Sequence, residues 1–395
     1  MPTLLQLNAT CNQGSTGKIA ENIGLLMKKK GWSVYYAHGA RYINKSQLNT
    51  YQIQSVWSEY LHILKGLLWD AAGLGTTNET YKLIKYIQQI KPDIIQIHNL
   101  HGYYINYKIL FEYLNTTSIP IVITMHDCWL FTGHCAHFEL KNCEKWKTLC
   151  HHCPLISSYP KSLFRDNSKS NFLLKKELIS RNRNLHFVAV SKWLERLLRE
   201  SIYKDHYITT FRNGIDLNIY KPSIPKNQEK FQVLGVGNPW SKEKGLYDIY
   251  KLRDLLPSDE YDIVLVGLNQ KQLESIPRGI KGILRTNSQQ QLVDLYSSSN
   301  VFINPTYADT FPTTNLEALA CGTPVITYNT GGSPESIDDK TGMVIEKGNI
   351  YEIAAGIKQL KREPVSVELC VNRAHLFFDK NECFKHYVNL YESLL

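Results

Sequence analysis

The feature that most constrains this chain is the alternation of short, continuously apolar segments with amphipathic ones. The apolar segments of the first half lie at residues 3–8, 33–37, 93–99, 120–127 and 186–191. Those of the second half lie at residues 231–237, 261–267, 301–305 and 324–329. Strands that are apolar throughout and are separated by helical segments predict parallel sheets with helices on both faces.

A polar stretch at residues 216–230 separates the two halves and contains two prolines. The length of 395 residues is also too great for one ordinary domain. We therefore predict an α/β chain of two Rossmann-like domains, at residues 1–212 and 213–364. Helices over residues 365–395 should follow and pack back toward the first domain. Ligands of such sheets bind beyond the carboxyl ends of the strands.

The charge balance indicates which partners to expect, and the lengths of the apolar segments indicate the compartment. The chain has 45 Lys and Arg residues against 36 Asp and Glu, an excess of +9 that favours phosphate-bearing partners. No apolar run approaches the roughly 20 residues that a bilayer requires, and no signal-peptide pattern begins the chain. We expect a cytoplasmic protein, either free or peripheral on the inner face of the cell membrane. No recognised nucleic-acid-binding motif is present, so nucleic acid is not an expected partner.

Two segments bear on membrane attachment, and each has two interpretations. The basic surplus between Lys161 and Arg183 is either a solvated helix face or a patch for an anionic membrane or a phosphorylated acceptor. Residues 57–74 form an amphipathic, Trp-bearing pattern, which is either an ordinary core helix or a helix that lies on a membrane.

Residues 304–335 carry the clearest chemical pattern, because they read as strand, loop, helix, strand and loop. Asp309 falls on the first loop, and Glu317 falls in the first turns of the helix. Since the amides of a helix N-terminus stabilise anions, Glu317 can contact a diol while those amides hold a phosphate. Gly331 and Gly332, on the second loop, allow the backbone to approach a ligand closely.

This segment resembles the donor-binding signature of the retaining glycosyltransferases of family 4, which have the GT-B fold. The family pattern is an acidic residue, seven further residues, and then the Glu of an "EALACGTPV" run. The resemblance implies that Asp309 contacts the transferred sugar and that Glu317 binds the ribose hydroxyls of the nucleotide. The first acid is usually Glu, so Asp309 keeps the charge with a shorter reach. The resemblance covers most of the chain and implies two domains that face each other across a cleft.

Residues 235–246, "GVGNPWSKEKGL", resemble the family's glycine turn that ends in Lys-Gly. The resemblance gives Lys244 the role of stabilising the diphosphate, although a solvated lysine is the plainer interpretation. Asn238 stands where the family often has Arg, and Arg212 and Arg285 are candidates to supply that charge. The other residues predicted to bind the nucleotide sugar are Gly237, Thr310, Phe311 and Pro312.

The first half contributes a loop and a strand end. Gly14 and Gly17 lie in a loop between a strand and a helix, which in the family covers the donor phosphates. His126 and Asp127 end an apolar strand, where this type of sheet places site residues. In the family a His at this position contacts the donor sugar and shapes the acceptor side, and Asp127 would orient it. A hydrogen-bonded structural histidine is the alternative.

Four cysteines cluster within an expected insertion at about residues 128–160. They are Cys135, Cys143, Cys150 and Cys153. In a reducing compartment such clustering favours a structural zinc ion held by four thiolates over disulfides. Free thiols, or disulfides formed on oxidation, are the alternatives.

We therefore expect a retaining glycosyltransferase that moves a sugar from a UDP- or GDP-sugar to a glycan acceptor in bacterial surface polysaccharide synthesis. A hypothesis for the acceptor is a glycan on a lipid diphosphate. The chain contains no D-x-D triplet, the motif with which GT-A transferases hold a divalent metal, so we expect no catalytic cofactor. A sugar-nucleotide epimerase and an inactive nucleotide-sugar-binding subunit of the same fold are the alternatives.

Overall fold

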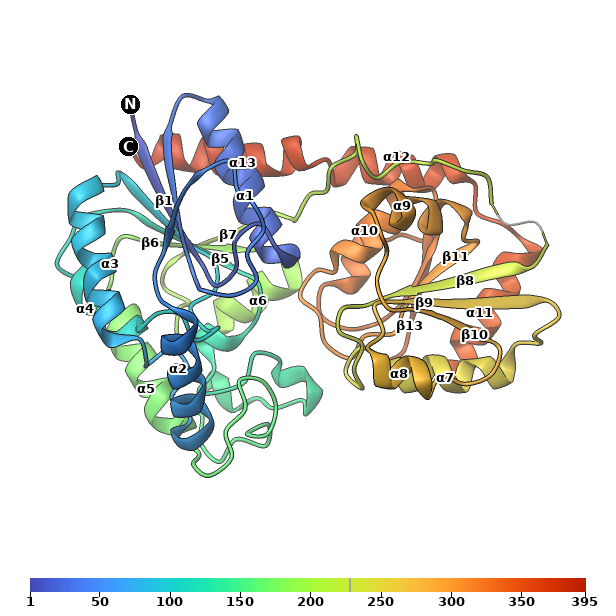
Figure 1. Ribbon diagram of the computed structural model, residues 1–395, viewed down its shortest axis with the longest axis horizontal. Coiled ribbons are helices and arrows are strands. Elements are labelled where there is room, and N and C mark those ends of the chain that lie inside the picture. Colours follow the sequence, from blue (N-terminus) through green and yellow to red (C-terminus); the bar gives the residue numbers. More distant parts are fainter. Residues whose placement is uncertain (227–228) are drawn as a thin grey trace. The chain divides into compact units, whose positions relative to one another are not determined.

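A computed structural model describes residues 1–226 and 229–395 of the chain. It divides into two compact units (Figure 1). Unit 1 comprises Met1–Arg212 together with Phe384–Leu395, and unit 2 comprises Asn213–Cys383. Asn227 and Gln228, within the expected linker, lie outside the described residues.

Unit 1 contains a seven-stranded parallel sheet in the order β3-β2-β1-β4-β5-β6-β7. Its strands are β1 (Thr3–Asn8), β2 (Ser33–His38), β3 (Asn49–Gln52), β4 (Ile94–Ile97), β5 (Ile121–Met125), β6 (Leu185–Ala189) and β7 (Tyr207–Thr210). The apolar segments predicted as strands all form strands here. The two edge strands β3 and β7 were not predicted, because they are short and largely polar.

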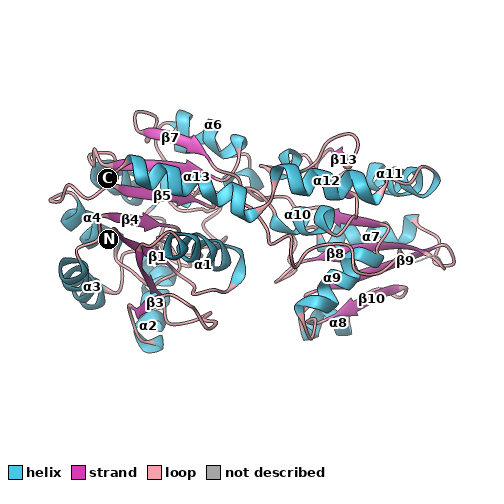
Figure 2. Cartoon of the chain, turned by 90° about the horizontal axis from the view of Figure 1, so that it is seen from above, coloured by secondary structure: helices cyan, strands magenta, loops and turns pink. Residues whose placement is uncertain are grey.

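The helices of unit 1 lie on both faces of this sheet (Figure 2). They are α1 (Gly14–Lys29), α2 (Val56–Trp69), α3 (Thr77–Ile90), α4 (Tyr107–Leu114), α5 (Ser168–Ile179), α6 (Lys192–Glu200) and most of α13 (Lys380–Ser393). Side-chain caps fix where two of these helices begin. The side chains of Asn106 and Ser191 accept hydrogen bonds from backbone amides in the first turns of α4 and α6. Short 3₁₀ turns, Trp129–Phe131, Phe138–Leu140 and Lys145–Lys147, occupy the Cys-rich insertion.

Unit 2 contains a six-stranded parallel sheet in the order β10-β9-β8-β11-β12-β13. Its strands are β8 (Phe231–Val236), β9 (Tyr261–Val266), β10 (Ile280–Ile283), β11 (Val301–Asn304), β12 (Val325–Tyr328) and β13 (Gly342–Ile345). Its helices are α7 (Leu246–Leu255), α8 (Gln270–Glu274), α9 (Gln289–Ser298), α10 (Thr313–Ala320), α11 (Ile350–Arg362) and α12 (Val367–Phe377), with a 3₁₀ turn at Ser333–Ser336. The edge strands β10 and β13 were again not predicted.

The C-terminal helices divide between the units rather than following one of them. Helix α12 belongs to unit 2, where Arg373 donates to the backbone oxygens of Ser336 and Ile337. The end of α13 belongs to unit 1, where the hydroxyls of Thr124 and Tyr387 lie 3.3 Å apart. The predicted domain boundary at residue 364 therefore differs from the structure, in which unit 2 continues to Cys383.

Both sheets reverse their strand order at one point, between β1 and β4 in unit 1 and between β8 and β11 in unit 2. In open parallel sheets, ligand sites lie beyond the carboxyl ends of the strands at such a reversal. The segments that follow β1, β4, β5, β8, β11 and β12 are therefore where a site is expected.

In the described part of the chain, no helix combines the length and the apolar composition needed to cross a membrane.

Candidate active site

Most of the residues singled out in unit 2 follow the carboxyl ends of β8, β11 and β12. The Nζ atom of Lys244 donates to Oδ2 of Asp309 across 2.8 Å, and both side chains are partly exposed. An ion pair with this exposure contributes only about 0–1 kcal/mol to folding. The pair therefore matters chiefly because it places a cation and a carboxylate side by side at the sheet edge.

The turn that carries Lys244 packs tightly against the segment after β11. Gly245 has a φ of +77°, and a Cβ atom there would lie 2.1 Å from the backbone oxygen of Pro305. The amide of Tyr307 also donates to the backbone oxygen of Glu243, across 2.7 Å. Packing thus explains the glycine of the Lys-Gly sequence, because only glycine permits this approach of the two backbones. The approach also brings Lys244 to Asp309.

The second loop is fastened to the backbone of Asp309. A Cβ atom on Gly331, whose φ is +56°, would lie 1.8 Å from the Asp309 backbone oxygen. The same oxygen accepts from the amide of Gly332, and Oδ1 of Asp309 accepts from the amide of Phe311. Both loops and the carboxylate are therefore held as one arrangement.

Glu317 lies on α10 and is oriented by tyrosines. The hydroxyl of Tyr296 donates to its Oε2 across 3.0 Å, and Tyr220 is a second hydrogen-bonding partner. Helix α10 is held in turn by Asn315, which accepts from Asn304 and donates to Ser336. Sequence reasoning missed both tyrosines, because nothing in the local pattern shows what packs beside Glu317.

The three residues between Asp309 and α10 are all buried. Pro312 is the N-cap residue of α10, and Thr310 is buried. Phe311 is buried as well, and its ring packs edge-on against Phe378. The side chain of Phe311 is occupied in the core, so the predicted contact with the nucleotide sugar would involve its backbone.

The glycine turn after β8 lies against a buried tryptophan. Trp240 packs over it, so a Cβ atom on Gly237 would lie 2.9 Å from the indole ring. The indole Nε1 donates to the backbone oxygen of Val266, which fixes this packing. Gly237 thus makes room for Trp240, and the turn continues to Asn238.

The two candidates for the missing positive charge follow other strands than those that carry the Lys244–Asp309 pair. Arg285 is exposed on the segment after β10, an edge strand two positions from β8. Arg212 is the last residue of the first segment of unit 1 and is partly buried.

In unit 1, the predicted residues follow β1 and β5. Gly14 begins α1 with a φ of +68° and is exposed, and the side chain of the N-cap residue Gln13 makes no capping hydrogen bond to the first amides of the helix. Gly17 instead packs against the preceding loop, because a Cβ atom there would lie 2.7 Å from the hydroxyl oxygen of Thr10. The helix N-terminus at Gly14 can therefore meet an anion, whereas Gly17 serves packing.

His126 is paired with a histidine that the sequence analysis did not select. Its Nε2 lies 2.9 Å from Nδ1 of His98, and the two rings stack with centroids 5.2 Å apart. Burial lowers the pKa of His126 to about 4 and lowers that of His98 as well. Both imidazoles are therefore neutral near pH 7, and one donates to the other. His98 follows β4 as His126 follows β5, so the strand-end rule that selected His126 could have found it.

Asp127 pairs with His101, and its charge also acts on His126, whose pKa it raises against the larger effect of burial. Its Oδ2 accepts from Nε2 of His101 across 2.5 Å, and its Oδ1 accepts from the amide of Trp129. Burial alone would raise the pKa of Asp127, but the neighbouring His101 brings it down to about 2. The other nitrogen of His101 lies 3.0 Å from the hydroxyl of Tyr159. Asp127, His101 and Tyr159 thus form a hydrogen-bonded chain.

These polar groups line a small hollow within unit 1, whose water-accessible volume is about 10 Å³. Its walls include His98, His101, His126, Asp127, Trp129 and Leu130. Imidazole and carboxylate groups of this kind can hydrogen-bond the hydroxyls of a sugar.

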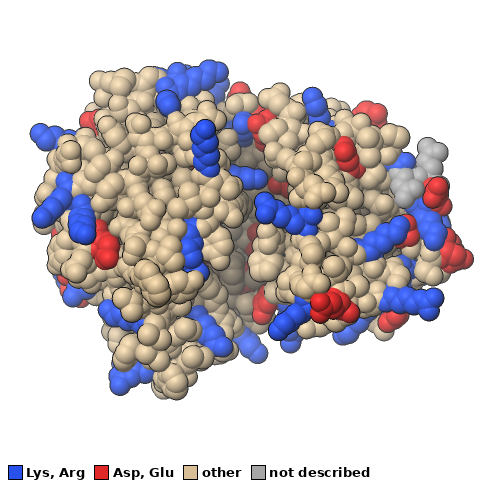
Figure 3. All heavy atoms as spheres, viewed as in Figure 1, with Lys and Arg blue, Asp and Glu red and all other residues tan. Residues whose placement is uncertain are grey.

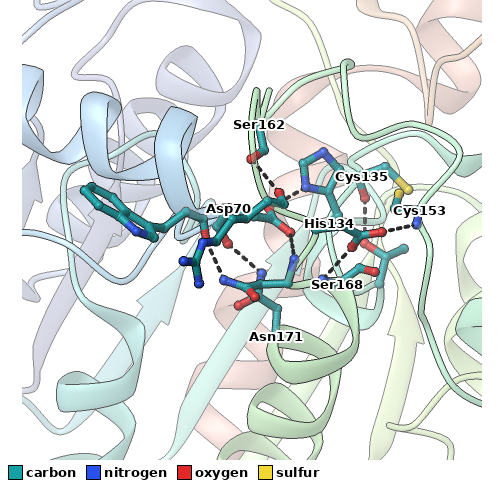
Figure 4. A network of polar contacts seen from close by, with 12 residues as sticks. Asp70, His134, Cys135, Cys153, Ser162, Ser168 and Asn171 are labelled. Atoms are coloured by element: carbon teal, nitrogen blue, oxygen red, sulfur yellow. Dashed lines mark hydrogen bonds and ion pairs between the residues drawn. The ribbon is translucent and has the colours of Figure 1, made fainter.

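The Cys-rich insertion is organised around a buried ion pair (Figure 4). Nδ1 of His134 lies 2.5 Å from Oδ1 of Asp70, and the carboxylate raises the pKa of His134 although burial alone would lower it. Beside this pair the thiol of Cys135 donates to Cys153, an interaction that lowers the pKa of Cys153 to about 7. The insertion therefore has a polar core, with Lys175 also buried and donating to the backbone oxygens of Trp129 and Thr132.

The predicted zinc site is only partly assembled. Cys135 and Cys153 are paired, and Cys150 lies near both of them and near Cys143. Within residues 1–226 and 229–395, however, no three His, Cys, Asp or Glu side chains are arranged to hold a metal ion. Structural zinc on these four cysteines stays a prediction, which the zinc content of the purified chain would test.

Comparisons with known proteins bear on both units. A family model described as "Glycosyl transferases group 1" matches residues 218–375, and one described as "Glycosyltransferase Family 4" matches residues 46–219. The chain is 20% identical to a putative colanic acid biosynthesis glycosyl transferase, WcaC of Escherichia coli K12, over 99% of this chain and 100% of the relative.

Two further similarities are more limited in what they show. An N,N'-diacetylbacillosaminyl-diphospho-undecaprenol alpha-1,3-N-acetylgalactosaminyltransferase of Campylobacter jejuni is 27% identical over 38% of this chain and 42% of the relative. The solved structure of sucrose-phosphate synthase from Thermosynechococcus elongatus matches with a TM-score of 0.75 and 16% identity, over 100% of this chain and 99% of that one. The structural similarity identifies the fold, which is GT-B.

The neutral state of the buried histidines predicts a pH dependence of stability. The pKa of His126 is about 4 in the folded chain against 6.5 for an ordinary imidazole, so between these values the unfolded chain binds the extra proton. The free energy of unfolding should therefore fall as the pH decreases from about 6.5 to 4, by up to roughly 3 kcal/mol for one such imidazole. Urea denaturation at pH 7.5 and pH 5 measures this, and His126→Asn should reduce the difference. Equal stability of the original chain at the two pH values would contradict the assignment of a buried neutral imidazole.

The contact between Gly331 and Asp309 predicts the effect of adding one methyl group. Gly331→Ala should lower the free energy of unfolding of unit 2 by more than about 1 kcal/mol, because the new Cβ must displace the Asp309 backbone. Gly348→Ala is the matched control, since Gly348 also has a positive φ but its Cβ would meet only Tyr307 Oη, at 3.4 Å. Thermal denaturation of both variants compares them, and a Gly331 variant no less stable than the control would refute the contact.

Proposed function

The chain belongs to the family 4 glycosyltransferases of the group 1 type, and from this premise we propose that it transfers a sugar from a nucleotide-diphosphate sugar to a glycan acceptor. We place this reaction in the synthesis of a bacterial surface polysaccharide. The support is the full-length similarity to a putative colanic acid biosynthesis glycosyl transferase. The partial similarity to an enzyme named for a diphospho-undecaprenol substrate favours an acceptor on a lipid diphosphate.

The observation that carries the proposal is the pairing of Lys244 with Asp309 at the carboxyl edge of the unit 2 sheet. When the glycosidic bond breaks, negative charge develops on the departing nucleotide diphosphate. A cation already fixed beside that position stabilises the transition state without first having to be moved there. Lys244 supplies this cation, and Asp309, which it contacts, lies where it can accept from a hydroxyl of the sugar.

Glu317 completes the donor side of the proposal. Its carboxylate is oriented by Tyr296 and Tyr220, and it lies on α10, which begins three residues after the Asp309-Thr310 pair. A carboxylate has two acceptor oxygens, so it can accept from both hydroxyls of a ribose diol. The N-terminal amides of α10 offer partners for phosphate oxygens.

Unit 1 supplies the acceptor side. The hollow beside His126 and His98 presents neutral imidazoles, and Asp127 with His101 presents a charge-assisted hydrogen bond. In the retaining mechanism of this family, the acceptor hydroxyl attacks the anomeric carbon on the face that the nucleotide leaves, and the departing phosphate takes the proton. We propose that the unit 1 residues position this hydroxyl, and that Lys244 rather than a divalent metal neutralises the leaving group.

The proposal is tested by turnover and by product stereochemistry. The purified chain is incubated with UDP- or GDP-sugars and with lipid-diphosphate glycans, and the release of nucleotide is measured with and without acceptor. Transfer that requires the acceptor, continues with a chelator present, and keeps the anomeric configuration by NMR is the expected result. Nucleotide release without acceptor would instead identify an epimerase, and donor binding without turnover on any acceptor would identify a binding subunit.

Removal of the cation gives the sharpest test of the donor site. Lys244→Met should lower kcat/KM by roughly a hundredfold or more, because the charge on the departing diphosphate loses its fixed partner. Lys242→Met, two residues earlier on the same exposed turn, is the matched control and should leave the rate nearly unchanged. Steady-state kinetics on the two variants make the comparison, and equal rates would remove Lys244 from the proposed mechanism.

A further inference from the structure

Helix α2 presents large apolar residues to the surface and buries two polar ones, Glu59 and His62. Over Val56–Trp69 the buried residues are Glu59, His62 and Gly66. Trp57 is 80% exposed and Leu61 is 69% exposed, and Tyr60, Leu64 and Trp69 are exposed with them. A helix on the surface of a water-soluble domain normally has the reverse arrangement, so this face is built to meet something apolar.

The buried polar residues fix the helix in this orientation. Nε of Arg41 donates to Glu59 across 2.5 Å, and Nδ1 of His62 lies 2.7 Å from the hydroxyl of Thr76. Nε2 of His62 also accepts from the amide of Gly75, across 2.9 Å. Rotation of the helix to hide its apolar side would break these hydrogen bonds and leave the amide of Gly75 without its partner, which is costly.

A neighbouring loop extends the exposed apolar surface. The amide of Leu163 donates to the backbone oxygen of Leu67 on α2, across 2.8 Å. This places Phe164, which is 76% exposed, beside the helix. We call the combined surface the α2 face. It consists of Val56, Trp57, Tyr60, Leu61, Leu64, Trp69, Leu163 and Phe164.

Positive charge borders the α2 face. Lys65, Lys161 and Arg165 are exposed on the same two segments. The nearby carboxylates are already engaged, since Glu59 pairs with Arg41 and Asp166 accepts from the amides of Cys153 and Ser168. Figure 3, in the view of Figure 1, shows mainly uncharged atoms over α2 with Lys and Arg groups around them. Lys175, which the sequence analysis counted with this basic stretch, is buried and adds nothing to it.

We propose that the α2 face docks on an anionic phospholipid bilayer. Trp and Tyr side chains favour the headgroup level of a membrane, whereas Leu and Phe favour the acyl region beneath it. The basic residues at the border meet the lipid phosphates, each contributing about a fivefold gain in affinity. The combination of apolar face, aromatic residues and basic border is what selects a lipid surface as the occupant.

The docking surface is connected to the acceptor side of unit 1. The loop that carries Phe164 follows Tyr159, whose hydroxyl lies 3.0 Å from His101 at the hollow. A glycan whose lipid tail remains in the bilayer could thus reach the hollow from the docked face. This part of the inference rests on the proposed function, but binding to a membrane does not.

The test uses the full chain and phospholipid vesicles, with no donor or acceptor present. Vesicles that contain phosphatidylglycerol should carry the chain to the top of a flotation gradient at low salt, and phosphatidylcholine vesicles should carry much less. The double variant Leu61→Ser with Phe164→Ser should weaken binding by roughly tenfold or more. The matched control is Tyr351→Ser with Leu376→Ser, which removes two residues of unit 2 that are 71% and 75% exposed. Circular dichroism confirms that each variant is folded.

Three results would overturn the proposal: no flotation with anionic vesicles, equal loss in the control variant, or a dimer in sedimentation velocity that the double variant dissociates while vesicles bind neither form. The last would identify the α2 face as an interface between two copies of the chain. Because no sugar transfer is measured, each of these results leaves the proposed function standing. Conversely, vesicle binding without turnover on any acceptor would count against the proposed function alone.

Discussion

The close approach of two loop backbones beyond β11 is the constraint on which the candidate donor site depends. Gly245 brings the lysine turn against Pro305, and Gly331 brings the second loop against Asp309. Neither contact leaves room for a side chain, so the position of the Lys244–Asp309 pair follows from where two glycines stand. The pair itself contributes little to folding. Its geometry is imposed by the packing of the backbone, which is how an exposed ion pair becomes a preorganised site.

Unit 1 shows a second kind of constraint, in which hydrogen-bonded polar groups determine which side of α2 is buried. Buried ion pairs and imidazoles hold α2 and the Cys-rich insertion, from Glu59 and Arg41 to His134 and Asp70. These groups occupy interior positions that apolar residues usually take, and they can do so because they have hydrogen-bonding partners there. The apolar residues of α2 are left outside as a consequence. The same organisation places a polar hollow and an apolar surface within one unit, which suits an acceptor that has a sugar at one end and a lipid at the other.

The sequence predicted the features that depend on a local pattern of residues. It did not predict the side chains whose partners come from distant parts of the chain. The central strands could be predicted because burial on both faces makes them apolar throughout, but β3, β7, β10 and β13 could not, because edge strands are short and mixed in composition. Asp309 and Glu317 are recognisable from their spacing within residues 304–335, and Lys244 from the glycine turn at residues 235–246, in both cases through the resemblance to the family. His98 could have been found by the strand-end rule, whereas Tyr159, Tyr220 and Tyr296 carry no local signal. Asp127 was assigned to His126 from adjacency alone, and the structure pairs it with His101.

The central claim is that Lys244 and Asp309 act together on one bound sugar diphosphate. A double-mutant cycle measures this directly, with Lys244→Met, Asp309→Asn and the combined variant compared in kcat/KM for the transfer reaction. Residues that act on the same ligand and contact each other should show effects that are not additive, with a coupling of at least about 1 kcal/mol. Effects that simply add, or a combined variant as active as the original chain, would contradict the account.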